Sequence, residues 1–392
     1  MNNSNFSIKF INHASLQIKG LNNYLTDPWY ISNAFGKWTQ NPPPFFSDVK
    51  NILKTKKLNI LVSHGHDDHC DDFFIRNYLR NNRIIIPKLN SKGFLRRIEK
   101  LSDKKIIEVE ENGLNISKSN EKIYSFICDE TQSVHDSIMI ITNKKEAIIH
   151  ANDNWHILGK KIRESIKKVC EGKYIYYFSQ IGIANSFPIY YGKYSLRDMK
   201  LIIKKRMINY LKNLKVNIDL IKPDMTISYA NQSKFTDELD LNTYQIAQEF
   251  IQNFPHVRQL NPGDKIVNGK IFINKKKLNY LPEELLKLIE KKFKNFMRAK
   301  NNKAFTVKFI SSNKKKEFLD NEIFPKKNEI YYVAKDYVWS DIFCGKLNLE
   351  TISIGGNGYI FKNKKTNIIS VHQNLSEFSY IFQNVICKKY FN

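Results

Sequence analysis

Cysteine, glycine and proline are all scarce in this chain of 392 residues. The five cysteines are an odd number at irregular spacings and contain no Cys-x-x-Cys pair, which argues against a disulfide framework and a cysteine-based zinc site. Only 15 glycines and 11 prolines occur, which excludes collagen-like and low-complexity classes. No run of about 18 apolar residues is present, so no membrane-spanning helix is expected. The N-terminal residues lack the pattern of a signal peptide, and a cytoplasmic location is the simplest expectation.

Arginine is scarce as well, although the chain is strongly basic. Lysine and arginine number 63 against 38 acidic residues, a formal net charge of +25, and such a balance raises the question of nucleic-acid or membrane binding. Only 10 of the 63 basic residues are arginine, the residue best suited to bidentate phosphate contacts. The lysines are spread in short runs. We therefore expect a solvated basic surface that attracts an anionic small molecule, rather than a nucleic-acid-binding face.

Short apolar strands alternate with helical patterns along most of the sequence, which predicts an α/β protein. Strands are expected at 6–20, 23–26, 58–62, 84–87, 123–128, 137–142, 147–150, 174–179 and 225–229, and helices at 157–170, 195–213, 239–253 and 282–299. The length and the turn at 262–264 predict two domains, residues 1–265 and 266–392.

The densest group of chemically active side chains is His-Gly-His-Asp-Asp-His at residues 64–69, which holds three of the nine histidines. It follows the apolar strand at 58–62 and precedes a helical pattern, so its side chains can converge on one point. Imidazole binds zinc, iron and similar metals, and a carboxylate adds an oxygen ligand. The alternative is a polar loop with chance histidines, and their concentration within six residues speaks against it.

This H-x-H-x-D-H pattern resembles the signature of the metallo-β-lactamase superfamily, and the resemblance covers residues 6–265. It implies an αββα sandwich, with a smaller α/β appendage at the C-terminal end. It also implies that His64 and His66 hold a first metal and that Asp68 and His69 hold a second.

The resemblance implies two further ligands beside the ends of later strands. His135, just before a strand, would complete the first metal site, and Asp153, just after a strand, would bridge the two metals. Asp68 and Asp153 are the residues implied to position a metal-activated water or to accept its proton. Zinc, as one or two ions, is the expected cofactor, with iron or manganese as alternatives.

The sequence departs from the family at the last metal ligand. The family places a histidine after a late strand, but residues 228–231 read Ser-Tyr-Ala-Asn. The second metal is therefore expected to be weakly bound, to have fewer protein ligands, or to be absent. His150 is expected to be a buried histidine rather than a ligand, and His13 to be structural or to support a ligand. Asp27 either orients a metal-bound histidine or is a turn residue.

Other segments narrow the resemblance to one branch. Asp-Pro-Trp at 27–29, with residues 34–38 and 41–43, looks like the metallo-β-lactamase-type domain of CMP-N-acetylneuraminate hydroxylases, and residues 185–191 and 339–347 are similar to that group too. Those hydroxylases also carry a Rieske centre, which needs paired cysteines and histidines, and no Cys-x-His pair occurs in this sequence.

Four functions are consistent with these patterns. The first is a metal-dependent hydrolase acting on an anionic small molecule, for instance a sugar or nucleotide-sugar derivative that resembles sialic acid. The second is an iron-dependent hydroxylase component that receives electrons from a separate Rieske or ferredoxin partner. A nucleic-acid processing protein and a binding module without catalysis are the other two.

Overall fold

The computed structural model describes residues 5–36, 38–89, 92–116, 120–128, 136–154, 157–182, 194–231, 233–235, 251, 254, 256–300, 306–311, 325–326, 328–353, 357–362 and 369–382. The chain divides into two compact units, residues 1–30 with 40–277 and residues 31–39 with 278–392. The domain boundary predicted after residue 265 falls inside strand β16 (Lys265–Val267), which pairs with β1 (Ser7–Asn12) of the first unit.

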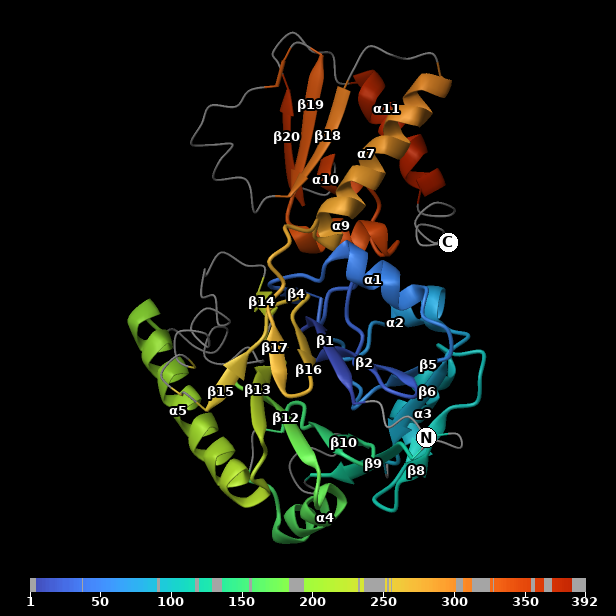
Figure 1. Ribbon diagram of the computed structural model, residues 1–392. Coiled ribbons are helices and arrows are strands. Elements are labelled where there is room, and N and C mark those ends of the chain that lie inside the picture. Colours follow the sequence, from blue (N-terminus) through green and yellow to red (C-terminus); the bar gives the residue numbers. More distant parts are fainter. Residues whose placement is uncertain are drawn as a thin grey trace. The chain divides into compact units, whose positions relative to one another are not determined.

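The first unit contains two large β-sheets (Figure 1). The first sheet has the strand order β17-β16-β1-β2-β3-β5-β6-β7. Its strands from β17 to β3 are antiparallel, and those from β3 to β7 are parallel. Besides β1 and β16 it comprises β2 (Ser15–Lys19), β3 (Asn23–Thr26), β5 (Leu58–Leu61), β6 (Arg83–Pro87), β7 (Ile107–Val109) and β17 (Lys270–Phe272).

The second sheet has the order β15-β13-β12-β11-β10-β9-β8. Strands β11, β12, β13 and β15 run parallel, while β8, β9 and β10 form antiparallel pairs. The strands are β8 (Leu114–Asn115), β9 (Lys122–Ile127), β10 (Ser137–Thr142), β11 (Glu146–His150), β12 (Tyr174–Gln180), β13 (Met225–Tyr229) and β15 (Val257–Gln259). Two short strands, β4 (Trp38–Gln40) and β14 (Ser233–Phe235), belong to neither large sheet.

Strand β10 shows how the layers follow from the sequence. Met139 and Ile141 face the core between the two sheets, whereas Ile138 and Ile140 face a second core beneath helices α4 (Lys160–Cys170) and α5 (Leu196–Ile221). Because alternate side chains of a strand point to opposite faces, a strand buried on both sides reads as a continuous apolar run. Each such buried side chain stabilises the fold by about 1.5–3 kcal/mol.

Helices α1 (Phe46–Leu53), α2 (Asp72–Phe74) and α3 (Lys92–Glu99) lie beside the first sheet (Figure 1). Helix α2 continues as a π-helical stretch, η1 (Ile75–Leu79). Buried Asp48 of α1 pairs with Lys9 of β1, which ties this helix to the first sheet. The order of layers is therefore helix, sheet, sheet, helix, and the predicted α/β class with an αββα sandwich is confirmed.

A buried carboxylate also connects the two sheets. Glu121, just before β9, accepts hydrogen bonds from the backbone N–H groups of Leu21 (2.7 Å) and Asn22 (3.0 Å) and from Tyr24 Oη (2.7 Å). These donors belong to the turn between β2 and β3 and to β3 itself. The carboxylate thus satisfies backbone groups that would otherwise be buried without partners.

Most predicted elements are present, with shifts of a few residues at their ends. Helix α5 runs to Ile221, eight residues beyond the predicted end at 213, because Leu214, Asn217 and Ile221 continue its buried face at helical spacing. The helix predicted at 239–253 lies outside the described residues except for residue 251.

The second unit holds a three-stranded sheet of order β18 (Thr306–Ser311), β19 (Glu329–Ala334) and β20 (Gly358–Lys362). Helices α7 (Leu281–Ala299), α9 (Asp336–Phe343), α10 (Glu350–Ser353) and α11 (Ile369–Ile381) accompany it (Figure 1). Phe293 of α7 contacts the rings of Phe309 and Phe378, so strand and helices share one aromatic core. Among the described residues, no helix is long and apolar enough to cross a membrane.

Candidate metal centre

The candidate ligands lie on turns at one edge of the two sheets. The motif at 64–69 follows β5, Asp153 follows β11, and His13 lies in the turn between β1 and β2. Four non-glycine residues at this edge adopt positive φ angles: His13 (44°), Asp27 (35°), Asn152 (61°) and Ala230 (53°). Such conformations cost about 1–2 kcal/mol per residue and concentrate at functional sites, because they aim side chains in directions that regular backbone does not.

The first group of converging side chains is His64, His66 and Asp153, whose ligand atoms all lie within 4.8 Å of one another. His64 Nε2 is 2.8 Å from His66 Nδ1 and 3.7 Å from Asp153 Oδ2, and His66 Nδ1 is 4.0 Å from the same oxygen. Zinc bonds of about 2.0–2.2 Å place tetrahedral ligand atoms roughly 3.3–3.6 Å apart, which is close to these separations. The His66 side chain is 52% exposed, so the group is accessible from solvent.

The second group is His13, Asp68 and His69, all buried and again with ligand atoms within 4.8 Å of one another. Asp68 Oδ2 lies 3.2 Å from His13 Nε2 and 3.7 Å from His69 Nε2. Asp153 faces this group too, because its Oδ1 is 3.2 Å from His69 Nε2 while its Oδ2 faces His64. The two groups therefore share one carboxylate.

Several buried polar atoms at this position form no hydrogen bond. They are Nδ1 and Nε2 of His13, Oδ1 of Asp68, Nε2 of His69 and Oδ1 of Asp153. A buried polar atom without a partner costs about 1–3 kcal/mol. An imidazole binds a cation through only one ring nitrogen, so divalent cations coordinated by His13 Nε2, His69 Nε2 and these oxygens would satisfy all of these atoms except His13 Nδ1. The residues present therefore fit a metal ion.

Asp27 supports the centre from beneath. Its Oδ2 accepts hydrogen bonds from His69 Nδ1 (2.8 Å), His150 Nε2 (2.8 Å) and Ser63 Oγ (2.6 Å), and its Oδ1 accepts one from Ser63 N (2.8 Å). Because His69 Nδ1 donates a hydrogen bond to Asp27, the other ring nitrogen, Nε2, faces the centre. Asp27 was expected either to orient a ligand histidine or to be a turn residue. The contact with His69 favours the first interpretation, because a turn residue does not require it.

The charge balance of Asp27 follows from these partners. Burial alone would raise the pKa of the carboxyl, but the charges and hydrogen bonds of His150 and His69 outweigh it and hold the pKa well below its usual value. His150 is fully engaged, since its Nδ1 bonds Tyr229 Oη at 2.7 Å. His150 is thus a buried, hydrogen-bonded histidine, as the sequence predicted. Tyr229, from the stretch where the family's last histidine would lie, also accepts from Asn152 N (2.8 Å).

The electrostatics of the centre also favour a cation. Burial lowers the pKa of His64 to about 3, and the nearby His69 adds to this effect. Burial would lower the pKa of His69 as well, but the carboxylates of Asp153 and Asp68 outweigh it and raise this pKa well above its usual value. His64 is therefore a neutral imidazole, as a metal ligand must be. Without a metal, the carboxylates hold a proton on His69, and a bound cation would take its place.

Arg97 of α3 holds the loop that carries the motif. Its guanidinium donates to the carbonyl oxygen of Gly65 and forms ion pairs with Asp67 Oδ1 and Asp72 Oδ1, both at 3.0 Å. Arg97 thus connects the start of the motif to helix α2. The sequence contained no local signal for this contact, because 30 residues separate Arg97 from Asp67.

The structure brings together the predicted residues His64, His66, Asp68, His69 and Asp153. The predicted ligand His135 lies outside the described residues. Asp136, Asn152 and Tyr229 also lie at this site; the sequence predicted core packing for Tyr229 and no role here for the other two. Asp136 Oδ1 is 3.9 Å from His64 Nε2, and Asn152 Nδ2 is 3.1 Å from His64 Nδ1. Position next to a predicted ligand was the only signal for the first two of these residues.

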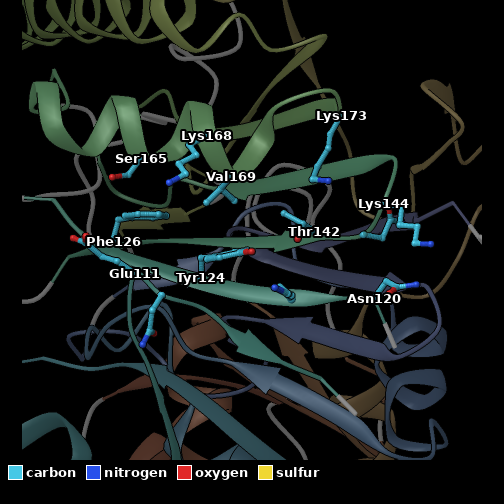
Figure 2. Close-up of a pocket in the computed structure, with 13 residues that line it drawn as sticks. Glu111, Asn120, Tyr124, Phe126, Thr142, Lys144, Ser165, Lys168, Val169 and Lys173 are labelled. Carbon is cyan, nitrogen blue, oxygen red and sulfur yellow. The ribbon is translucent and has the colours of Figure 1, made fainter. Parts of the chain in front are cut away.

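A pocket of about 670 Å³ lies elsewhere in the first unit. Figure 2 shows Lys168 and Val169 of α4 above Tyr124 and Phe126 of β9, with Lys173 at the upper right. None of its lining residues is a histidine or belongs to the two ligand groups. The pocket is therefore separate from the metal centre.

No protein-family model matches the sequence, and no curated protein matches it. Solved structures with a similar fold include CmlA, a diiron β-hydroxylase from Streptomyces venezuelae (TM-score 0.44, 14% identity, 70% of this chain covered). The chain covers only 55% of CmlA, about half its length. An isothiocyanate hydrolase from Delia radicum gut bacteria has a TM-score of 0.45 and 12% identity, with 67% of this chain and 98% of that chain covered.

The metallo-β-lactamase fold protein YhfI from Bacillus subtilis has a TM-score of 0.40 and 12% identity, with 68% of this chain and 99% of that chain covered. Because each of these TM-scores lies below 0.5, the assignment of the αββα fold rests on the sheets and layers of this chain.

Proposed function

We propose that this protein is a metal-dependent hydrolase whose first metal is held by His64, His66 and Asp153. The observation that carries the proposal is the convergence of His64, His66 and Asp153, whose ligand atoms all lie within 4.8 Å of one another, beside a second group whose buried atoms include unpaired ones. Asp68 and His69 extend the site toward a second metal. Zinc, as one or two ions, suits this set of imidazole and carboxylate ligands, and iron or manganese are the alternatives.

When bound, such a metal polarises its substrate and lowers the pKa of a coordinated water to about 7. Asp68 and Asp27 have different roles in the proposed reaction. Burial would raise the pKa of Asp68, but His69 and His13 outweigh it and lower the pKa, so Asp68 is ionised at neutral pH. Its Oδ1 forms no hydrogen bond and can accept the proton that an attacking water loses. Asp27 keeps His69 Nε2 directed at the centre.

The proposed substrate is an anionic small molecule. The net charge of +25 supports this class, because a basic surface raises the local concentration of anions. Within that class, a sugar or nucleotide-sugar derivative similar to sialic acid is the finer proposal, and it rests on the sequence resemblance alone.

The test is metal analysis followed by hydrolysis assays. The purified protein is expected to contain bound metal, and the double variant His64→Ala/His66→Ala is expected to lose it. His256→Ala is the matched control, because His256 is an exposed histidine outside both ligand groups. The loaded wild-type protein is then assayed on anionic esters, lactones and sugar derivatives, with incorporation of oxygen from labelled water as the readout.

Three results would overturn the proposal. Equal metal content in the wild type and the double variant would exclude the motif as the ligand set. A wild-type protein that binds no metal would favour the binding module. Oxygen consumption with a reductant and an electron-transfer partner, in place of hydrolysis, would favour the iron-dependent hydroxylase component.

A further inference from the structure

The sequence lacks one ligand that the resemblance implies for the second metal, because residues 228–231 contain no histidine. The structure shows what the corresponding stretch does. Tyr229 bonds His150, and Asn231 Nδ2 donates to the carbonyl oxygen of Ile181 (2.6 Å). The backbone N–H of Ala230 donates to the carbonyl oxygen of His13 (2.9 Å). The end of β13 therefore holds the turn that carries a different histidine.

That histidine is fully buried and has no hydrogen bond at either ring nitrogen. The ring of His13 packs edge-on against Trp29 (centroids 5.1 Å apart) and against His69 (5.3 Å). Its backbone φ of 44° and a hydrogen bond from the neighbouring Asn12 side chain to Trp29 O (3.0 Å) fix the turn. An imidazole placed this firmly, at positive φ and with two unpaired nitrogens, would be costly without a partner for its ring.

We propose that His13 is a metal ligand and that it completes the second subsite with Asp68 and His69, in place of the missing histidine. His13 Nε2 lies 3.2 Å from Asp68 Oδ2, and Asp68 Oδ2 lies 3.7 Å from His69 Nε2. Asp153 Oδ1, 3.2 Å from His69 Nε2, adds a shared fourth ligand. Two imidazoles with carboxylates suit zinc, iron or manganese. The inference rests on the proposed metal centre, since Asp153 belongs to both subsites.

The principal alternative is an ion pair between a protonated His13 and Asp68. That contact joins His13 Nε2 and Asp68 Oδ2 at 3.2 Å, but it leaves Asp68 Oδ1 without a hydrogen bond. The ion pair would also leave His69 Nε2 without a hydrogen bond, whereas a metal would engage both rings at once. The arrangement therefore favours coordination.

The experiment compares the wild type with His13→Phe, which keeps an aromatic ring against Trp29 but removes the ligand nitrogens. Metal-free protein is loaded with zinc, and the bound metal is counted by elemental analysis. Cobalt loading gives a separate readout through its absorption spectrum. We expect two equivalents in the wild type and one in His13→Phe, with His256→Ala unchanged. Urea unfolding of the metal-free forms checks that His13→Phe folds.

A second measurement needs no variant that might misfold. Cadmium-113 bound to wild-type protein with nitrogen-15-labelled histidine is expected to show coupling to the ring nitrogens of four histidines in the described part of the chain, His13 among them. Two equivalents in His13→Phe, or no coupling at His13, would overturn the inference and leave the proposed function intact. A wild-type protein without bound metal would instead overturn the proposed function itself.

Discussion

Replacing Asp27 by asparagine should weaken both the metal centre and the fold. The Asp27 carboxylate is fully buried and accepts four hydrogen bonds, three at Oδ2 and one at Oδ1. Asparagine has the same shape but only one acceptor oxygen. In its better orientation, with the oxygen toward His69 and His150, its NH₂ group would face the N–H of Ser63.

The magnitude follows from these contacts. Hydrogen bonds to a charged group contribute about 1.5–3 kcal/mol each, roughly twice the value of neutral ones. Asp27→Asn loses one of the four hydrogen bonds outright, and the other three are no longer made to a charged group. We therefore expect the free energy of unfolding to fall by about 3–5 kcal/mol, which is the range found for broken buried ion pairs. Loss of support for a ligand histidine typically lowers metal affinity 10–100-fold, and we expect this at His69.

The assay has two parts, urea unfolding of the metal-free protein followed by circular dichroism, and metal titration against a chromophoric chelator. Asp48→Asn is the matched control, because Asp48 is also a buried carboxylate but pairs with Lys9 away from the centre. It should lower stability and leave metal affinity unchanged. If Asp27→Asn had wild-type metal affinity, Asp27 would be a turn residue only, and the argument for its role would be refuted.

Three further predictions concern other parts of the first unit. Arg97→Ala should reduce metal affinity about 10-fold by releasing the motif loop, while Arg96→Ala, exposed on the same helix, should not; calorimetric titration would show the difference. Glu121→Gln should lower the free energy of unfolding by about 2–3 kcal/mol in a urea titration, since its NH₂ would face N–H or O–H donors, whereas exposed Glu111→Gln should have little effect. Burial raises the pKa of the Cys170 thiol to about 12, so it stays protonated, and iodoacetamide at pH 8 should label it only after unfolding; rapid labelling of the native protein would contradict its buried position.

The parts of the fold that could be predicted are those with a local pattern. The apolar run of β10 and the histidine motif at 64–69 each carry their signal within six residues. The end of α5 was predicted eight residues early, although Leu214 and Ile221 continue its buried face.

The rest of the site depends on contacts between distant segments. His13 lies more than 50 residues before Asp68, and nothing in its own turn shows that the two side chains meet. Asp27 gathers Ser63, His69 and His150 from two sheets, and only the assembled sandwich places them within hydrogen-bonding distance. Such residues are found from the fold, because the sequence records their identity but not their partners.

The hydrogen bond between Asp27 and His150 has a consequence for how the protein gains and loses its metal. Asp27 follows β3 of the first sheet and His150 belongs to β11 of the second, so the bond crosses the sandwich directly beneath the ligands. An ion that binds only the native arrangement raises the free energy of unfolding by about 2.7 kcal/mol at a hundredfold excess over its dissociation constant. Since both sheets supply ligands, neither can separate while the ion is held. For an ion in the buried group of His13, Asp68 and His69, exchange with a chelator would then be limited by opening of the sandwich, and the chain would retain that ion through brief exposure to metal-poor surroundings.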